Sequence, residues 1–357
     1  MIRVIGILLI IVCVPAYTQS VVSLNVKERA GIARQGEPVT MGVPIPDGFA
    51  SDTSLFALKD ASGNVIPCEF RKAARWWSDK SSIRWLHLDF RTDIAANETK
   101  TFHLCKEPSS HNVQSSLSVQ DLGTKFEITT GPLKFTVKKQ GFNLFDEAWV
   151  NEVANGTFTD AHKVVASHNK GFSLLSLGVR YYASNDNSST AVIERKGPLS
   201  CVIRSDGYLK DASGVSKYFV RTRIYAYSGS REVKVVFSFE NRDANVSNYV
   251  IQNGLNMELP LNVTNPEFSF GAPGGLKSGS LTSGQEAYLN IHKIDKFRFG
   301  GVLNDSGSPL SVKSPELGWV LLKEGSKGVG VHTRWLWQMY PSSVEVNSTG
   351  LINVGLF

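Results

Sequence analysis

The segment VHTRWLWQMY, residues 331–340, holds the side chains best suited to chemistry. If this segment is a β-strand, its alternation places four polar side chains on one face: His332, Arg334, Gln338 and Tyr340. A guanidinium can pair with a carboxylate, and an imidazole or a phenol can transfer a proton. The same pattern also fits a strand at a domain interface, with the aromatic face packed and the polar face hydrogen-bonded.

A second cluster lies in ARWWSDKSSIRWLHLDF, residues 74–90, which holds three of the seven tryptophans around a polar turn. An exposed ring at Trp76 or Trp77 could stack on the face of a sugar, while packing against the protein is the alternative role. Arg75 and Arg84 place positive charge next to these rings. The turn is therefore a candidate substrate-binding element.

The alternating half of this cluster predicts a strand with two unlike faces. One face carries Arg84, Leu86, Leu88 and Phe90, and we expect its three apolar members to be buried. The other face carries Ile83, Trp85, His87 and Asp89. His87 and Asp89 could form an acid/base pair, but residues two apart on a strand lie about 7 Å apart, too far for a direct hydrogen bond. His87 is therefore kept as a substrate-binding candidate, with a structural histidine as the alternative.

Strand patterns dominate the rest of the chain, and the predicted class is all-β. Only FDEAWVNEVANG (145–156) has an apolar spacing that could form a short helix. Short strands over 21–107 predict a small antiparallel barrel or sandwich, the polar stretch 108–121 predicts a linker, and the longer strands over 122–357 predict a large sandwich. In VRTRIYAY, we expect Arg221, Arg223 and Tyr225 on the wet face. The chain stops within a strand-like segment, which indicates a longer protein.

The N-terminus has one positive charge followed by an apolar run from Val4 to Val14. That run is too short to span a bilayer, so residues 1–20 are predicted to be a cleaved secretory signal, and the mature protein to be extracellular with no membrane segment. Removing Cys13 with the signal leaves an odd number of cysteines. We expect a disulfide between Cys68 and Cys105, with three inert buried thiols as the alternative.

The formal charge of +6 is spread along the chain rather than gathered in one block. On a secreted protein, a diffuse basic surface suits an acidic polysaccharide as the partner. Nucleic acid is not expected, because there is neither a basic cluster nor a recognised nucleic-acid-binding motif. Seven Asn-x-Ser/Thr sequons are candidate glycosylation sites: Asn97, Asn155, Asn187, Asn245, Asn262, Asn304 and Asn347.

The sequence lacks the common catalytic and metal-binding motifs. GxSxG, HExxH, paired CxxC and P-loop patterns are absent, and no EF-hand-like calcium loop occurs. No metal ligands are assigned, and neither a cofactor nor an oligomeric state follows from the sequence.

Two motifs together resemble the start of the exo-rhamnogalacturonan lyase-like (PcRGLX-like) family. The first is KERAGIARQGEPVTMGVPIPDG (27–48), with G-x-x-R and P-V followed by G-V-P-x-P-x-G, and the second is the tryptophan segment RWWSDKSSIRWLHLDF. The family more often shows Trp-Pro-Asp-Gly-Ser where this chain has Trp77, Ser78, Asp79, Lys80 and Ser81. Segments 131–139 and 334–346 resemble the family's sandwich more loosely.

The resemblance implies an N-terminal RIFT barrel, a central β-sandwich and a C-terminal α/α toroid, and the toroid is missing from this sequence. It also implies β-elimination on rhamnogalacturonan or a related acidic glycan. A cation must then neutralise the uronate carboxylate while another group takes a proton. In this interpretation Arg334 binds the carboxylate, and His332 or Tyr340 handles the proton.

Without the toroid, we expect the chain alone to be inactive. The rival hypotheses are a non-catalytic glycan-binding or cell-surface interaction protein and a related hydrolase.

Overall fold

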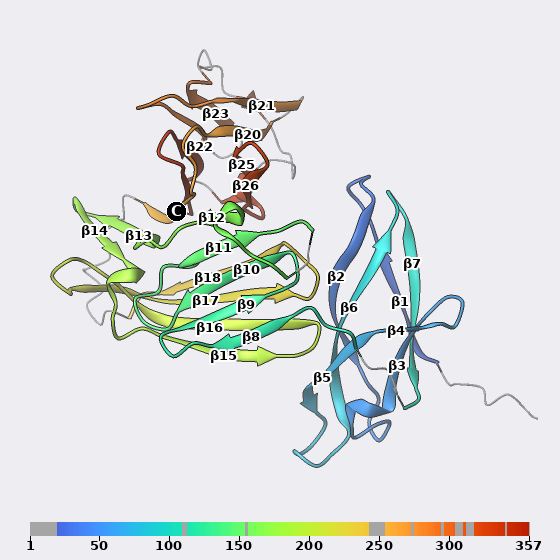
Figure 1. Ribbon diagram of the computed structural model, residues 1–357. Coiled ribbons are helices and arrows are strands. Elements are labelled where there is room, and N and C mark those ends of the chain that lie inside the picture. The colour runs from blue at the N-terminus through green and yellow to red at the C-terminus, as the bar shows by residue number, and fades with distance from the viewer. Residues whose placement is uncertain are drawn as a thin grey trace, which may run out of the picture. The chain divides into compact units, whose positions relative to one another are not determined.

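The computed structural model describes residues 20–108, 113–153, 156–242, 254–272, 275–293, 296–303, 310–311, 318–339 and 341–356. The predicted signal therefore lies outside the described residues, apart from Ser20 in the first strand. The chain divides into two compact units, residues 1–114 and 115–357 (Figure 1). Each unit is described on its own below.

The first unit contains two antiparallel sheets that share one apolar core. One sheet has the order β1-β7-β3-β4, with bounds Ser20–Lys27, Thr99–Lys106, Phe56–Asp60 and Val65–Ile66. The other has the order β2-β6-β5, with bounds Arg34–Pro44, Ile83–Ile94 and Cys68–Arg75. A short 3-10 helix, η1 (Thr53–Leu55), precedes β3.

Strand β6 confirms the predicted core face, because Leu86, Leu88 and Phe90 are all buried. The alternation breaks at the start of the strand, where Ile83 is buried and Arg84 is exposed. The pairing of β5 with β6 shifts register beside these residues, between Lys72 and Arg75. A bulge of this kind turns a side chain to the other face of a strand.

The loop between β1 and β2 is built around Glu28, whose side chain is buried. Its carboxylate accepts backbone N–H bonds from Ala30 (2.7 Å), Gly31 (2.8 Å) and Ile32 (3.2 Å), and from Asn97 at 3.0 Å. Gly31, the glycine of the segment KERAGIAR (27–34), has φ +72°, a conformation that glycine adopts at little cost. The motif therefore encodes a loop wrapped around one carboxylate.

The second unit contains three antiparallel sheets. The five-stranded sheet has the order β12-β11-β10-β9-β8, with bounds Lys163–Val165, Glu147–Val150, Leu133–Lys138, Lys125–Thr129 and Ser118–Asp121. The four-stranded sheet has the order β21-β20-β25-β26, with bounds Gly275–Ser280, Glu267–Ala272, Trp319–Glu324 and Lys327–His332.

The largest sheet has twelve strands in the order β18-β17-β16-β14-β13-β19-β28-β27-β22-β23-β24, with β15 also pairing with β16. The bounds of β13 to β18 are Gly171–Ser176, Val179–Tyr182, Thr190–Lys196, Ser200–Lys210, Ser216–Tyr227 and Val233–Glu240. Those of β19, β22, β23, β24, β27 and β28 are Leu255–Pro260, Glu286–Lys293, Lys296–Gly301, Leu310–Ser311, Ser342–Asn347 and Leu351–Gly355. Short 3-10 helices are η2 (Asp160–His162), η3 (Ala183–Asn185) and η5 (Leu336–Gln338).

Within this unit, the five-stranded sheet lies against strands β15 to β18 of the large sheet, and the two form a sandwich (Figure 1). One apolar core runs through both sheets, with Phe135 from β10 and Phe172 from β13 among its fully buried members. The predicted all-β class is therefore confirmed, and the described residues contain only short 3-10 helices.

One local prediction is wrong, and the predicted linker is wrong at its C-terminal end, although the boundary between the two units lies within it. The segment predicted as a possible helix forms strand β11, because Trp149 and its neighbours pair with β10 on one side and β12 on the other. The predicted linker 108–121 ends inside strand β8, which pairs with β9 from Ser118 to Asp121. In both cases, partners distant in the sequence decide the local structure.

The wet face of the long strands carries a ladder of ion pairs. Arg223 donates to Glu194 at 2.6 Å, Arg221 donates to Asp206 at 2.7 Å, and Arg204 contacts both carboxylates, at 2.9 and 3.3 Å. These residues come from β15, β16 and β17, and the alternate positions of β17 are buried. The predicted wet face of VRTRIYAY is confirmed, and we call these five residues the ion-pair ladder.

The predicted disulfide is wrong. Cys68, Cys105 and Cys201, the cysteines of the described residues, are all buried and none is disulfide-bonded. Cys68 begins β5 and Cys105 lies in β7, so the two belong to different sheets of the first unit.

We expect a thiol reagent to label Cys68 only after unfolding, because burial raises the pKa of its thiol well above the ordinary value. A reductant should leave the Tm of the protein unchanged. Mass spectrometry of native and denatured protein after alkylation checks the first point. A lower Tm under reducing conditions would contradict the second.

Among the described residues, no helix is both long and apolar enough to cross a lipid bilayer.

Candidate functional site

The tryptophan turn, residues 76–82, joins β5 to β6 and is closed by hydrogen bonds of Ser78, Ser81 and Ser82. The N–H of Ser81 donates to the carbonyl of Ser78 at 3.0 Å, and the Oγ of Ser81 accepts from the N–H groups of Trp77 (3.0 Å) and Ser78 (3.1 Å). The N–H of Trp76 donates to the carbonyl of Ser82 at 3.1 Å. A serine side chain thus supplies the acceptor that orders this turn.

Trp77 is 78% exposed, the largest fraction of any exposed tryptophan in the described part of the chain. Its Nε1 donates to Oδ2 of Asp47 at 2.8 Å, which holds the ring in place. The other oxygen of Asp47 accepts from Ser82 Oγ at 2.6 Å and from the N–H of Gly48 at 2.8 Å. A large apolar ring that is both exposed and anchored forms a rigid platform for a ligand.

These hydrogen bonds also keep Asp47 ionised. The bond from Ser82, followed by that from Trp77, lowers the pKa of the Asp47 carboxyl below its ordinary value. Asp47 lies in the GVPIPDG motif and Ser82 follows the turn, so the two sequence motifs meet at one site. Sequence reasoning missed both residues, because only the fold brings segments 47–48 and 76–82 together.

Trp76 and the two arginines have different roles. Trp76 is half-buried and its Nε1 donates to the carbonyl of Ile45 at 2.9 Å, while the guanidinium of exposed Arg84 lies 5.1 Å from the centre of its ring. Arg75 donates to the carbonyl oxygens of Ser51 and Ser81, so it braces the turn. Arg84, in β6 beside the turn, and Lys80, within it, are both exposed cations.

His87 belongs to a hydrogen-bonded network on the outer face of the β2-β6-β5 sheet. Arg71 bridges it to Asp89: the Nη2 of Arg71 lies 3.5 Å from His87 Nδ1 and 3.0 Å from Asp89 Oδ2. Asp89 is buried and also accepts from Thr40 Oγ1 at 2.5 Å. Arg71 and Thr40 thus hold Asp89, and Arg71 links it to the imidazole of His87.

The predicted polar face of segment 331–340 does not form. Strand β26 ends at His332, and the chain then turns, with Trp335 at φ +59°, into η5. Leu336 is buried against Gly318, where a Cβ would come within 2.6 Å of its side chain. Burial of the Leu336 side chain favours this turn over an extended conformation.

His332, Arg334 and Gln338 are consequently exposed at different points of a turn, and Tyr340 lies outside the described residues. Partial burial of the ring lowers the pKa of His332 below its ordinary value, although much of its side chain remains exposed. The guanidinium of Arg334 lies 4.0 Å from the ring centre of Trp335, which is 54% exposed. The strand geometry that motivated a catalytic role for these residues is therefore absent.

The candidate glycosylation sites differ in their exposure to solvent. Asn97, Asn187 and Asn262 are exposed, and Asn347 is half-buried, while Asn155, Asn245 and Asn304 lie outside the described residues. In the described part of the chain, no group of three or more His, Cys, Asp or Glu side chains is arranged to hold a metal ion.

Part of this chain is similar to a known protein family. Residues 117–267 match the family model of the PcRGLX-like protein central beta sandwich domain. The match begins near the start of the second unit, so the barrel assignment of the first unit remains a prediction. No curated protein matches this chain.

A solved structure shares the fold. It is described as a protein in the glycosyl hydrolase family 38 from Enterococcus faecalis, and it aligns with a TM-score of 0.56 at 11% sequence identity. The alignment covers 94% of this chain but only 40% of that chain. At this identity the similarity concerns the fold alone.

Proposed function

We propose, because residues 117–267 match the PcRGLX-like central beta sandwich domain, that this is a secreted, polysaccharide lyase-like protein acting on rhamnogalacturonan or a related acidic glycan. Within the described residues, its tryptophan turn binds a sugar of that glycan. The observation that carries this proposal is the anchored, exposed ring of Trp77.

Three physical arguments support a glycan as the ligand. The flat ring of Trp77 can cover the apolar face of a pyranose, while Asp47 and Arg84 supply hydrogen-bonding groups nearby. The net charge of +6 favours an acidic polymer over a neutral one. A glycan would also agree with the glycosyl hydrolase description of the solved neighbour.

A purely glycan-binding role is the second candidate, and one observation favours it. The side chains expected to carry β-elimination, His332 and Arg334, are exposed around a turn instead of aligned on a strand. Binding without turnover is therefore the expected behaviour of this chain.

Calorimetric titration with rhamnogalacturonan and with a neutral polysaccharide tests the proposal. We expect binding to the acidic polymer alone, weakened by added salt as the charges are screened. Equal affinity for the neutral polymer, or none for either, would refute the proposal.

Ultraviolet absorbance of the same mixtures detects the unsaturated uronate that β-elimination produces. Product above the level of a heat-denatured control would establish the lyase, and a saturated product would identify a hydrolase. Binding with neither product would favour the glycan-binding role.

A further inference from the structure

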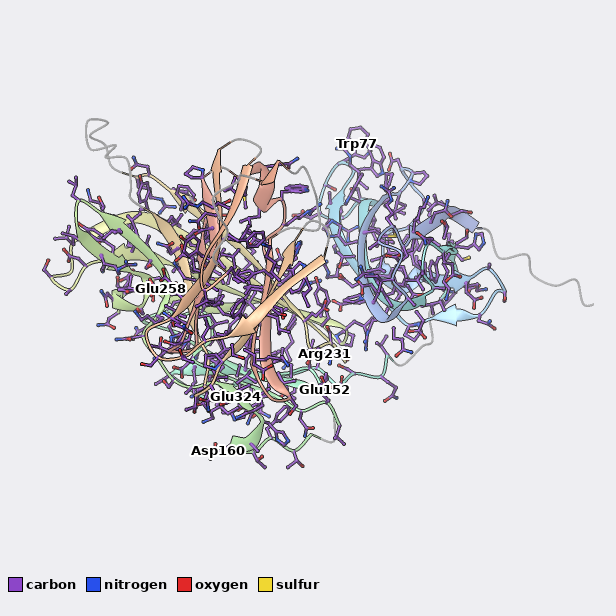
Figure 2. The ribbon with its side chains drawn as sticks, turned by 90° about the horizontal axis from the view of Figure 1, so that it is seen from above. Trp77, Glu152, Asp160, Arg231, Glu258 and Glu324 are labelled. Atoms are coloured by element: carbon purple, nitrogen blue, oxygen red, sulfur yellow. The ribbon has the colours of Figure 1, made fainter. Side chains whose placement is uncertain are left out.

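A buried carboxylate in the second unit is surrounded by donors from neighbouring strands. Glu258 lies in β19 and is labelled in Figure 2. It is only 4% exposed. Its Oε1 accepts from Ser173 Oγ at 2.6 Å and from Arg180 Nη1 at 3.0 Å. Its Oε2 lies 3.1 Å from Lys170 Nζ and 3.5 Å from the hydroxyl of Tyr182. We call these five residues the Glu258 cluster.

The hairpin β13–β14 brings the donors together. Its two-residue turn, Leu177 and Gly178, has φ values of +50° and +79°, the signs of a type I′ turn that joins twisted antiparallel strands. Arg180 and Tyr182 are two apart on β14 and so share a face, and Ser173 is paired directly opposite Tyr182. The core face of the same strands is buried, with Phe172 among its members.

Lys170 reaches the cluster from the loop before β13. The next residue, Gly171, has φ +116°, and a Cβ there would lie 2.9 Å from the backbone of Asn143. Gly171 is also paired directly opposite Glu258. Only glycine allows the chain to pass this close to its neighbour, and the path it takes sets Lys170 beside the carboxylate.

The charges of the cluster do not cancel. One carboxylate faces two cations, which leaves a net charge of +1 if all three groups are ionised. Burial lowers the pKa of Lys170, but hydrogen bonds to Tyr182 and Glu258 outweigh this effect and raise it above its ordinary value. The ammonium group is therefore positively charged at neutral pH.

Both cations remain open to solvent. The side chains of Lys170 and Arg180 are 39% and 41% exposed, whereas that of Glu258 is 6% exposed. Within the described residues, Arg180 hydrogen-bonds through Nη1, so its other N–H donors are available to a ligand. A guanidinium fixed from one side by a buried carboxylate is well suited to a second, planar anion.

We propose that the Glu258 cluster binds the carboxylate of an acidic sugar. Arg180 and Lys170 contact the carboxylate, the Tyr182 hydroxyl contacts a neighbouring sugar oxygen, and Glu258 with Ser173 positions the cations. The choice of ligand class rests on the proposed function, but the site uses none of the residues of the tryptophan turn. All five residues lie in the part of the chain that matches the family.

Calorimetric titration of the full chain with trigalacturonate, and with the same trisaccharide after reduction of its carboxylates to alcohols, tests the site. We expect the wild-type protein to prefer the acidic probe, and Arg180→Gln and Lys170→Gln each to weaken its binding about tenfold with little effect on the reduced probe. Arg221→Gln is the matched control, because it removes a half-exposed, carboxylate-paired arginine elsewhere in the same unit. It should leave the affinity unchanged.

The outcomes separate this inference from the proposed function. If Trp77→Ala weakens binding while both cluster variants bind as the wild type does, the inference is overturned and the proposed function stands. If the cluster variants weaken binding and Trp77→Ala does not, the inference stands without the tryptophan turn. Equal wild-type affinity for the acidic and reduced probes overturns the inference even if a variant fails to fold.

Discussion

Replacement of Trp77 by alanine is expected to reduce the affinity for rhamnogalacturonan at least about tenfold. The ring is 78% exposed, so its removal should cost little stability beyond the loss of its hydrogen bond to Asp47. The loss would come from the apolar area and ring contacts that a bound sugar makes with the indole. Calorimetric titration of the wild-type and variant proteins measures the change, and thermal unfolding confirms that the Tm is preserved.

Two further variants make this experiment specific. Trp77→Phe keeps an aromatic ring but loses the hydrogen bond to Asp47, so an intermediate affinity is expected. Ile32→Ala removes another exposed apolar side chain of the same unit, 61% exposed, and should have no effect. Full affinity of Trp77→Ala would rule out the tryptophan turn as the binding site.

The second large effect is expected at Glu28, where Glu28→Gln should lower the Tm and flatten its dependence on pH in acid. The hydrogen bond from the N–H of Asn97 outweighs burial and, with three further N–H bonds, lowers the pKa of this carboxyl from 4.5 to about 2. Because the folded-state pKa is below the unfolded value, the stabilisation is fully present above about pH 4.5 and is lost as the pH falls towards 2. An amide nitrogen cannot accept the N–H bonds, so the variant lacks this contribution at every pH.

Thermal unfolding at a series of acidic pH values measures this difference. Glu152→Gln is a suitable control, because Glu152 is exposed and makes a single surface ion pair with Arg231 (Figure 2). Parallel Tm profiles for the wild type and Glu28→Gln across the acid range would contradict the assigned role of the carboxylate.

The regular strands were predictable from the sequence because their alternation reflects burial directly. Leu86, Leu88 and Phe90 in β6, and Arg221 and Arg223 in β17, lie on the expected faces. Segment 331–340 shows the limit of this reasoning. The conformation of this segment depends on the contact between Leu336 and Gly318, which lies fifteen or more residues earlier in the chain. The local pattern of apolar residues does not predict that contact.

The sites were less predictable than the strands. The sequence left exposure and packing of Trp77 as alternatives, and its anchor on Asp47 depends on two segments separated by about thirty residues. The Glu258 cluster was missed altogether, because β13 pairs with β19 although five other strands lie between them in the sequence. The order of strands in a large antiparallel sheet depends on tertiary structure. The spacing of residues in the sequence therefore does not predict which side chains from different strands meet.

The ion-pair ladder has a consequence for how the large sheet assembles. Strands β16 and β17 are eleven and twelve residues long, and a slip of β17 by one residue would move Arg221 and Arg223 to the core face. A slip of two residues would keep the faces but separate Arg221 from Asp206 and Arg223 from Glu194. The ion pairs therefore favour one register of these two long strands. They disfavour misaligned pairings that the apolar face alone would allow.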